Sequence, residues 1–196
     1  MKKITTITTA IAALAFMACG SNNMRYPDKT TKVNLTGKSV LIVAEDNAAG
    51  AAGAFGAAVA QKVGSIKILP GVPKDAVGIS KMYAEFGLKN QGNVNPSDPK
   101  AIALETILKL AANLGKFDTI VFAGAEKASG FSAPMTAKLE LYGAVYDIKT
   151  QKVTTAAYDT GTVVLAQAEA QMAIKGRGIA DDLLNGLSED KKEETK

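Results

Sequence analysis

Histidine and tryptophan are absent from this 196-residue chain, and cysteine occurs only once, at Cys19. Histidine is the commonest general base and a frequent metal ligand, so its absence excludes Ser-His-Asp and Cys-His catalytic sites. The D-x-[DN]-x-[DN]-G spacing of a calcium loop is also missing. Asp46 and Glu126 follow apolar runs, where sites of α/β proteins can form, but we interpret them as solvated strand ends. We therefore expect no catalytic site, no metal site and no cofactor, and a protein that is not an enzyme.

The charged residues do not form the kind of basic segment that binds nucleic acid. The chain has 23 Lys and Arg against 19 Asp and Glu, a net charge of +4, and no Lys/Arg cluster is interleaved with aromatic residues. Nucleic acid is therefore not an expected partner. The hydrophobic content of 47% is too high for a disordered protein, so we expect a folded domain.

The N-terminal segment has the plan of an exported protein. Two lysines precede an apolar stretch, residues 4–17, that is too short to span a membrane. Residues 16–19 (FMAC) resemble the lipobox of bacterial lipoproteins, in which the cysteine is acylated and becomes the first residue after cleavage. The simpler alternative is an ordinary secretory signal with a chance cysteine. A lone cysteine at this position favours the lipobox, because it has no disulfide partner.

The lipobox resemblance implies a lipid-anchored protein. Residues 1–18 would be the signal peptide, and acylated Cys19 would hold the mature chain in the lipid bilayer. Gly20 stands where lipoproteins retained in the inner membrane usually carry Asp. The outer membrane is therefore the favoured location, with the domain facing the periplasm.

Composition divides the remaining chain into a tether, one domain and a tail. Residues 19–37 are polar and rich in turn formers, which is typical of a flexible tether, and residues 188–196 are a solvated charged tail. Residues 38–187 are long enough to form a core. The elements expected there are strand 38–45, helix 48–63, strand 65–69, helix 75–86 stopped by Gly87, helix 99–114, strand 119–123, hairpin 135–164 with its turn at 149–152, and helix 165–187.

This order of elements predicts the fold class. In the strand at 119–123, Ile120 and Phe122 alternate with Val121, so both faces of that strand should be buried. Ile174 and Ile179 are expected among the core positions of the last helix, and Asp181 and Asp182 are interpreted as surface charge. The prediction is an α/β protein: a single layered domain with a mixed sheet, helices packed on it, and a long C-terminal β-hairpin followed by a helix.

Three glycines at the start of the first helix allow two interpretations. Gly50, Gly53 and Gly56 follow a strand, and a glycine-rich turn between strand and helix can hold phosphate. Their spacing is G-x-x-G-x-x-G, whereas the dinucleotide fingerprint is G-x-G-x-x-G, and no P-loop lysine follows. These glycines are therefore a weak candidate for a phosphate loop. A small-residue helix face that lies close to the sheet is the better interpretation.

Four segments carry a family resemblance. They are VLIVAEDN at 40–47, EFGL at 85–88 followed by NPSDP at 95–99, LGKFDTIV at 114–121 with Gly124, and LELYGAVYDIKTQK at 139–152. With the lipobox, they resemble the small bacterial lipoproteins related to the curli secretion channel CsgG, the penicillin-binding protein activator LpoB and the amino-terminal domain of TolB. Gln151 replaces the turn glycine that is usual in this group. The resemblance implies the α/β fold over residues 38–187, and none of its motifs is catalytic.

The resemblance and the anchor favour a non-catalytic protein-binding or assembly module in the periplasm, with a role in envelope biogenesis or secretion. The partner would be another envelope protein or a second copy of the chain, bound through the polar loops at 89–97 and 127–134. Phe131 is the candidate contact residue, because no strand or helix pattern requires it. The alternative is that it packs on the domain's own core.

A second function remains open, namely a subunit of an outer-membrane secretion channel or pore. Against it, the sequence shows no additional pair of strands with lipid-facing alternation. The predicted tether is also too short to cross the periplasm to an inner-membrane synthase, which disfavours a strict LpoB role.

The anchor can be tested directly. Substitution Cys19→Ala removes the only thiol of the chain and should abolish palmitate labelling and release the protein into the soluble periplasm. Cell fractionation with labelled palmitate measures both effects. A wild-type protein without label, together with unchanged membrane fractionation of the variant, would contradict the lipobox.

Overall fold

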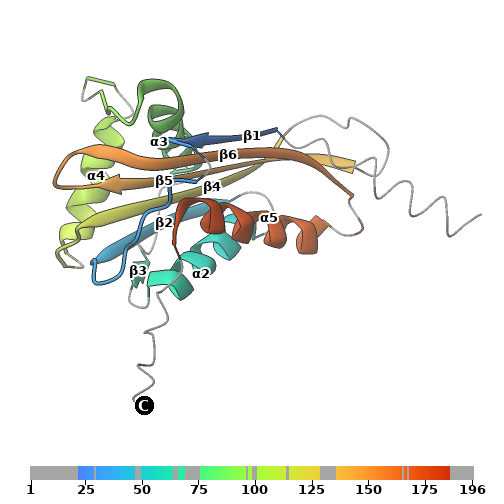
Figure 1. Ribbon diagram of the computed structural model, residues 1–196, viewed down its shortest axis with the longest axis horizontal. Coiled ribbons are helices and arrows are strands. Elements are labelled where there is room, and N and C mark those ends of the chain that lie inside the picture. The colour runs from blue at the N-terminus through green and yellow to red at the C-terminus, as the bar shows by residue number, and fades with distance from the viewer. Residues whose placement is uncertain are drawn as a thin grey trace, which may run out of the picture.

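The computed structural model describes residues 22–28, 30–46, 50–63, 66–68, 76–95, 97–98, 101–113, 115–128, 136–164, 166 and 168–185. Among these residues, six strands form one mixed sheet in the order β1-β6-β5-β4-β2-β3 (Figure 1). The strands are β1 (Asn22–Tyr26), β2 (Val40–Asp46), β3 (Ile66–Ile68), β4 (Thr119–Ala128), β5 (Thr136–Asp147) and β6 (Lys152–Val164). The helices described are α2 (Ala51–Val63), α3 (Ala76–Asn90), α4 (Ala101–Ala112) and α5 (Ala168–Leu183).

The sheet combines a parallel half and an antiparallel half. β2 pairs in parallel with β3 and β4, and helical crossovers connect these strands, as parallel pairing requires. β4, β5, β6 and β1 pair antiparallel in that order. The predicted α/β class is therefore confirmed, including the mixed sheet and the C-terminal hairpin that a helix follows.

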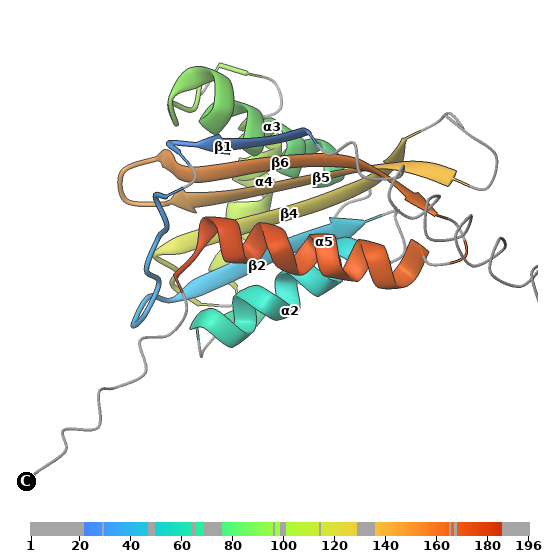
Figure 2. The same ribbon diagram turned by 45° about the vertical axis from the view of Figure 1, so that its right-hand side comes forward.

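Helices cover both faces of the sheet. Figure 2 shows α2 and α5 side by side across one face, and α3 and α4 lie on the other. The central strand β4 serves both layers. Val121 and Ala123 belong to the core under α2 and α5, whereas Ile120 and Phe122 belong to the core under α3. The prediction that both faces of this strand are buried is confirmed.

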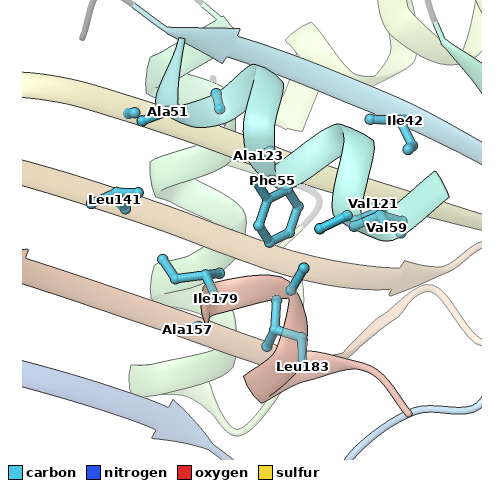
Figure 3. Close-up of a cluster of buried hydrophobic side chains, with 14 of the residues drawn as sticks. Ile42, Ala51, Phe55, Val59, Val121, Ala123, Leu141, Ala157, Ile179 and Leu183 are labelled. Atoms are coloured by element: carbon cyan, nitrogen blue, oxygen red, sulfur yellow. The ribbon is translucent and has the colours of Figure 1, made fainter. Parts of the chain in front are cut away.

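The core on each side has one dominant aromatic contact. On the α3 side, Tyr83 stacks on Phe122 with 4.3 Å between ring centroids and 9° between ring planes. On the other side, Phe55 of α2 lies against Ile179 and Leu183 of α5 (Figure 3). Gly143 of β5 makes room for this second contact, because a Cβ atom there would lie 2.8 Å from a methyl carbon of Ile179.

The flexible tether predicted for residues 19–37 is wrong over most of its length. Asn22–Tyr26 is the edge strand β1, which pairs with β6. Further on, the backbone N–H of Val33 donates to the carbonyl oxygen of Leu183 at 2.9 Å, and Leu35 is buried. The composition suggested a tether because only two of the five residues of β1, Met24 and Tyr26, are large apolar or aromatic residues.

A salt bridge connects the edge strand β1 to helix α5, which lies on one face of the sheet. The Arg25 side chain is only 5% exposed and forms a salt bridge with Asp182 of α5. Its guanidinium also donates to the carbonyl oxygens of Met24 at 2.8 Å and Tyr158 at 3.0 Å. The side chain of Asp182 is 46% exposed, so it is a surface carboxylate as predicted, but it also pairs with a buried arginine, which the sequence did not indicate. Asp181 lies 2.8 Å from the ammonium of Lys62 and remains largely exposed.

Gly87 does not end its helix as predicted, because α3 continues to Asn90. A Cβ atom at Gly87 would lie 2.3 Å from the Cβ of Ala156, so the glycine is explained by the close approach of helix and sheet. The chain leaves the helix at Gln91 and Gly92, whose φ angles are 52° and 80°. The predicted loop at 89–97 therefore begins as helix.

The ends of other elements also differ from the prediction. The strand expected at 119–123 continues to Ala128, so the loop expected at 127–134 begins inside β4. The last helix covers Ala168–Leu183 and not residues 165–187. Ile174, an expected core position, is 68% exposed, whereas Ile179 is buried as predicted. The apolar pattern of this alanine-rich helix is too weak to define its buried face.

The β5–β6 turn contains a residue other than glycine in the left-handed region. Gln151 has φ 55°, in the left-handed region that glycine favours. Asp147 accepts hydrogen bonds from the backbone N–H of Thr150 at 2.7 Å and from its hydroxyl at 2.9 Å. These local bonds hold the turn although residue 151 carries a side chain.

Two glycines of α5 offer a matched test of the helix pair. A Cβ atom at Gly176 would lie 2.2 Å from the carbonyl oxygen of Ala51 in α2, whereas a Cβ atom at Gly178 would meet nothing within 4 Å. Gly176→Ala should destabilise the fold by about 1–3 kcal/mol, because the helices must separate. Gly178→Ala should stabilise it by about 0.5–1 kcal/mol through helix propensity. Chemical denaturation of both variants measures the difference, and equal effects would contradict the close contact.

Candidate binding groove

A groove of about 240 Å³ opens between α3 and the β1–β6–β5 edge of the sheet. It lies on the face opposite α2 and α5, where Figure 1 shows α3 beside β1 and β6. Segments that are far apart in the sequence therefore contribute to it. Its lining residues are Met24, Lys81, Ala84, Glu85, Leu88, Lys89, Glu140, Tyr142 and Tyr158.

The sheet side of the groove is a row of cross-strand neighbours. Met24 of β1 pairs with Tyr158 of β6, which in turn pairs with Tyr142 of β5. The two tyrosine rings lie 5.2 Å apart between centroids, at an angle of 31°. Met24 is 42% exposed, which is high for a large apolar side chain. Strand register thus builds an aromatic surface with an accessible thioether at its edge.

The helix side combines an apolar strip with charges along its margins. Ala84 and Leu88 are one turn apart on α3, so they share a helix face. The Lys81 ammonium lies 5.2 Å from the centroid of the Tyr142 ring, within the range of a cation–π contact. The Lys89 ammonium lies 3.3 Å from the carboxylate of Glu85. The groove is therefore apolar at its base and carries charges of both signs at its rim.

Glu140 is held in its ionised form within this rim. Its carboxylate accepts a hydrogen bond from the hydroxyl of Tyr142 at 2.6 Å and another from the ammonium of Lys138 at 3.2 Å. The tyrosine bond is the largest cause that lowers the pKa of Glu140 below its ordinary value. Burial raises the pKa of both Tyr142 and Tyr158. At neutral pH the groove thus presents a carboxylate and two protonated phenols.

None of the sequence-predicted site residues that the structure describes lines this groove. Cys19 and Phe131 lie outside the described residues. Gly50 has φ 84° and immediately precedes α2, whereas Gly53 and Gly56 lie inside the helix. The position of a Cβ atom at Gly56 is 3.6 Å from side-chain carbons of Ala44 and Ile42. Gly56 therefore belongs to the contact between helix and sheet, and the three glycines do not form a single loop.

Sequence reasoning had part of the signal for the groove. Alternation along residues 135–148 places Glu140 and Tyr142 on the same side of the hairpin, and the structure agrees. The sequence does not reveal Met24 as a groove residue, because the polar composition of residues 19–37 indicates a tether. It does not reveal Leu88 either, because Gly87 indicates the end of a helix.

The described part of the chain offers neither a metal site nor a membrane-spanning helix. No group of three or more His, Cys, Asp or Glu residues there is placed to hold a metal ion. Among the same residues, no helix is both long enough and apolar enough to cross a membrane.

No protein-family model and no curated protein sequence matches this chain. Some solved structures are distantly similar. One is a PelC dodecamer from Paraburkholderia phytofirmans, with 10% sequence identity and a TM-score of 0.46. The alignment covers 83% of this chain and 97% of the PelC chain. The hypothetical protein CT253 from Chlamydia trachomatis has 11% identity and a TM-score of 0.34, with 73% and 98% covered. Lipoprotein GNA1162 from Neisseria meningitidis has 14% identity and a TM-score of 0.33, with 74% and 99% covered.

The hydrogen bond between Tyr142 and Glu140 predicts a pH-dependent stability. Tyr142→Phe should raise the pKa of Glu140 towards its ordinary value of 4.5. Because the folded-state pKa is lowered, the bond stabilises the fold above that value, and the stabilisation is lost as pH falls through the folded-state pKa. The variant should be less stable than the wild type by about 1.5 kcal/mol at neutral pH, with a difference that disappears in acid.

Carboxyl NMR titration and denaturant unfolding at neutral and acid pH measure these effects. Tyr26→Phe is the matched control, because its hydroxyl donates to the backbone carbonyl of Gln91 at 2.7 Å and not to a carboxylate. This control should leave the pKa of Glu140 unchanged. If Tyr142→Phe also leaves it unchanged, the hydrogen bond does not determine the ionisation of Glu140.

Proposed function

We propose that this protein is a lipid-anchored envelope protein whose domain binds a segment of another polypeptide in the groove beside α3, without catalysis. The observation that carries the proposal is the row Met24–Tyr158–Tyr142, an apolar and aromatic groove wall between a helix and a sheet edge, in which Met24 is exposed, Tyr158 is partly exposed and Tyr142 is buried. Binding surfaces favour aromatic residues and methionine. A groove of about 240 Å³ has room for one or two side chains of a partner.

The ionisation of the groove supports binding and not proton transfer. A general acid or base works best when its pKa lies near the working pH. The pKa of Glu140 is lowered, and those of Tyr142 and Tyr158 are raised. Each of these pKa values therefore lies further from neutral pH than the ordinary value of its group. The charged rim, formed by Lys81, Glu85, Lys89 and Glu140, is suited to selecting a partner and its register.

The anchor and the family resemblance define the setting of this proposal. FMAC at residues 16–19 supplies the lipidation motif at Cys19, and Gly20 favours the outer membrane. The segments shared with the CsgG, LpoB and TolB group support a role in envelope biogenesis or secretion. An anchored domain meets partners at a high local concentration, so a small groove with modest affinity is sufficient.

Photocrosslinking in intact cells tests the groove. A photoreactive amino acid placed at Leu88, in the apolar strip of the groove, should yield a discrete crosslinked partner that mass spectrometry identifies. The same amino acid placed at Ile174, which is 68% exposed on α5, is the control on the other face and should not capture that partner.

A paired substitution then links capture to the groove. Met24→Glu, made in the Leu88 crosslinking protein, should reduce the yield about tenfold, equivalent to roughly 1.4 kcal/mol of binding energy. It should leave the melting temperature unchanged, because Met24 is 42% exposed. Ile174→Glu should leave the yield unchanged. Equal capture from Leu88 and Ile174, or no effect of Met24→Glu, would refute the groove as the binding site.

A further inference from the structure

The first residue of the sheet lies very close, along the chain, to the proposed lipid anchor. β1 begins at Asn22, and only two residues separate it from Cys19. Even a fully extended chain covers no more than about 11 Å over these three residue steps. The distance between the acylated residue and the sheet is therefore limited by covalent geometry, whatever conformation the two intervening residues adopt.

Strand register identifies which end of the sheet this limit applies to. Asn22 pairs with Thr160, which pairs with Glu140, and the neighbouring pair at the same end is Lys138 with Thr162. The β5–β6 turn lies at the opposite end, as Figure 1 shows. From Lys138 to the last residue of β5 there are nine residue steps, or roughly 30 Å. The sheet end at Asn22 must therefore lie close to Cys19, whereas the end with the β5–β6 turn lies far from it.

β1 also cannot easily peel away to lengthen the connection. Five of its residues pair with β6, and Arg25 is buried with bonds to Asp182, Met24 and Tyr158. Detaching β1 would leave Asp182 without its partner and would expose Tyr26, which packs against the core under α3. Detachment would thus break the backbone pairing with β6 together with the hydrogen bonds of the buried guanidinium.

We propose that the sheet end formed by Asn22, Lys138 and Thr162 faces the headgroup layer of the lipid bilayer, with the β5–β6 turn pointing away. The proposal rests on the lipid anchor at Cys19 proposed above. Met24 lies two residues from Asn22, about 7 Å further along β1. The groove therefore opens close to the membrane surface, and its partner is a membrane-proximal polypeptide segment.

Fluorescence quenching in vesicles tests this orientation with the full lipidated protein. Acylation converts the sulfur of Cys19 to a thioether, so an introduced cysteine becomes the only free thiol. Lys138→Cys provides the near probe and Lys149→Cys the far probe; both positions are exposed. The vesicles contain phosphatidylethanolamine and phosphatidylglycerol with a nitroxide on a fraction of the headgroups. The near probe should be quenched at least about threefold more strongly than the far probe, because roughly 30 Å separate the two positions.

A tether variant provides the control. Insertion of a flexible Gly/Ser segment of about 12 residues before Asn22 should remove the difference between the probes, because it frees the domain to rotate. Equal quenching of both probes in the protein without the insertion would overturn the orientation alone, since flotation with the vesicles would still support the anchor. A protein that does not float with the vesicles overturns both the anchor and the orientation.

Discussion

The pairing of β1 with β6, held by Arg25, is the constraint on which the functional surfaces of this protein depend. The guanidinium of Arg25 is buried and bonded to Asp182 of α5 and to two backbone carbonyls. These bonds hold the short strand β1 at the edge of the sheet. That strand supplies Met24 to the groove. It also determines how far the domain can lie from Cys19, the proposed site of lipidation.

The two faces of the sheet are packed by different means. Small residues bring α2 and α5 together, with Gly176 against the backbone of Ala51 and Gly143 beneath Ile179. On the other face, aromatic packing dominates, with Tyr83 stacked on Phe122. A second aromatic pair, Tyr142 and Tyr158, lies nearer the sheet edge, and Tyr158 is only partly buried. The candidate groove thus lies at the edge of the core under α3.

The charges of the groove are paired at its rim. Each acidic group at its rim has a nearby lysine, as in the pairs Glu85–Lys89 and Glu140–Lys138, so a partner meets paired charges around an apolar base. Exposed pairs of this kind contribute little to stability, and their value lies in selecting complementary charge. Together with the proposed membrane anchor, this arrangement would suit the proposed partner near the bilayer.

The sequence alone determined the α/β class, the buried central strand and the C-terminal hairpin, because continuous apolar runs and period-two alternation are local signals. It also determined the candidate anchor, which is a linear motif. Only the tertiary structure decided that residues 22–26 are a strand, that Gly87 lies within a helix, and that Ile174 faces solvent. The groove belongs to this second group. Its residues come from β1, α3, β5 and β6, and strand register and helix packing bring them together across long stretches of chain, which no local pattern encodes.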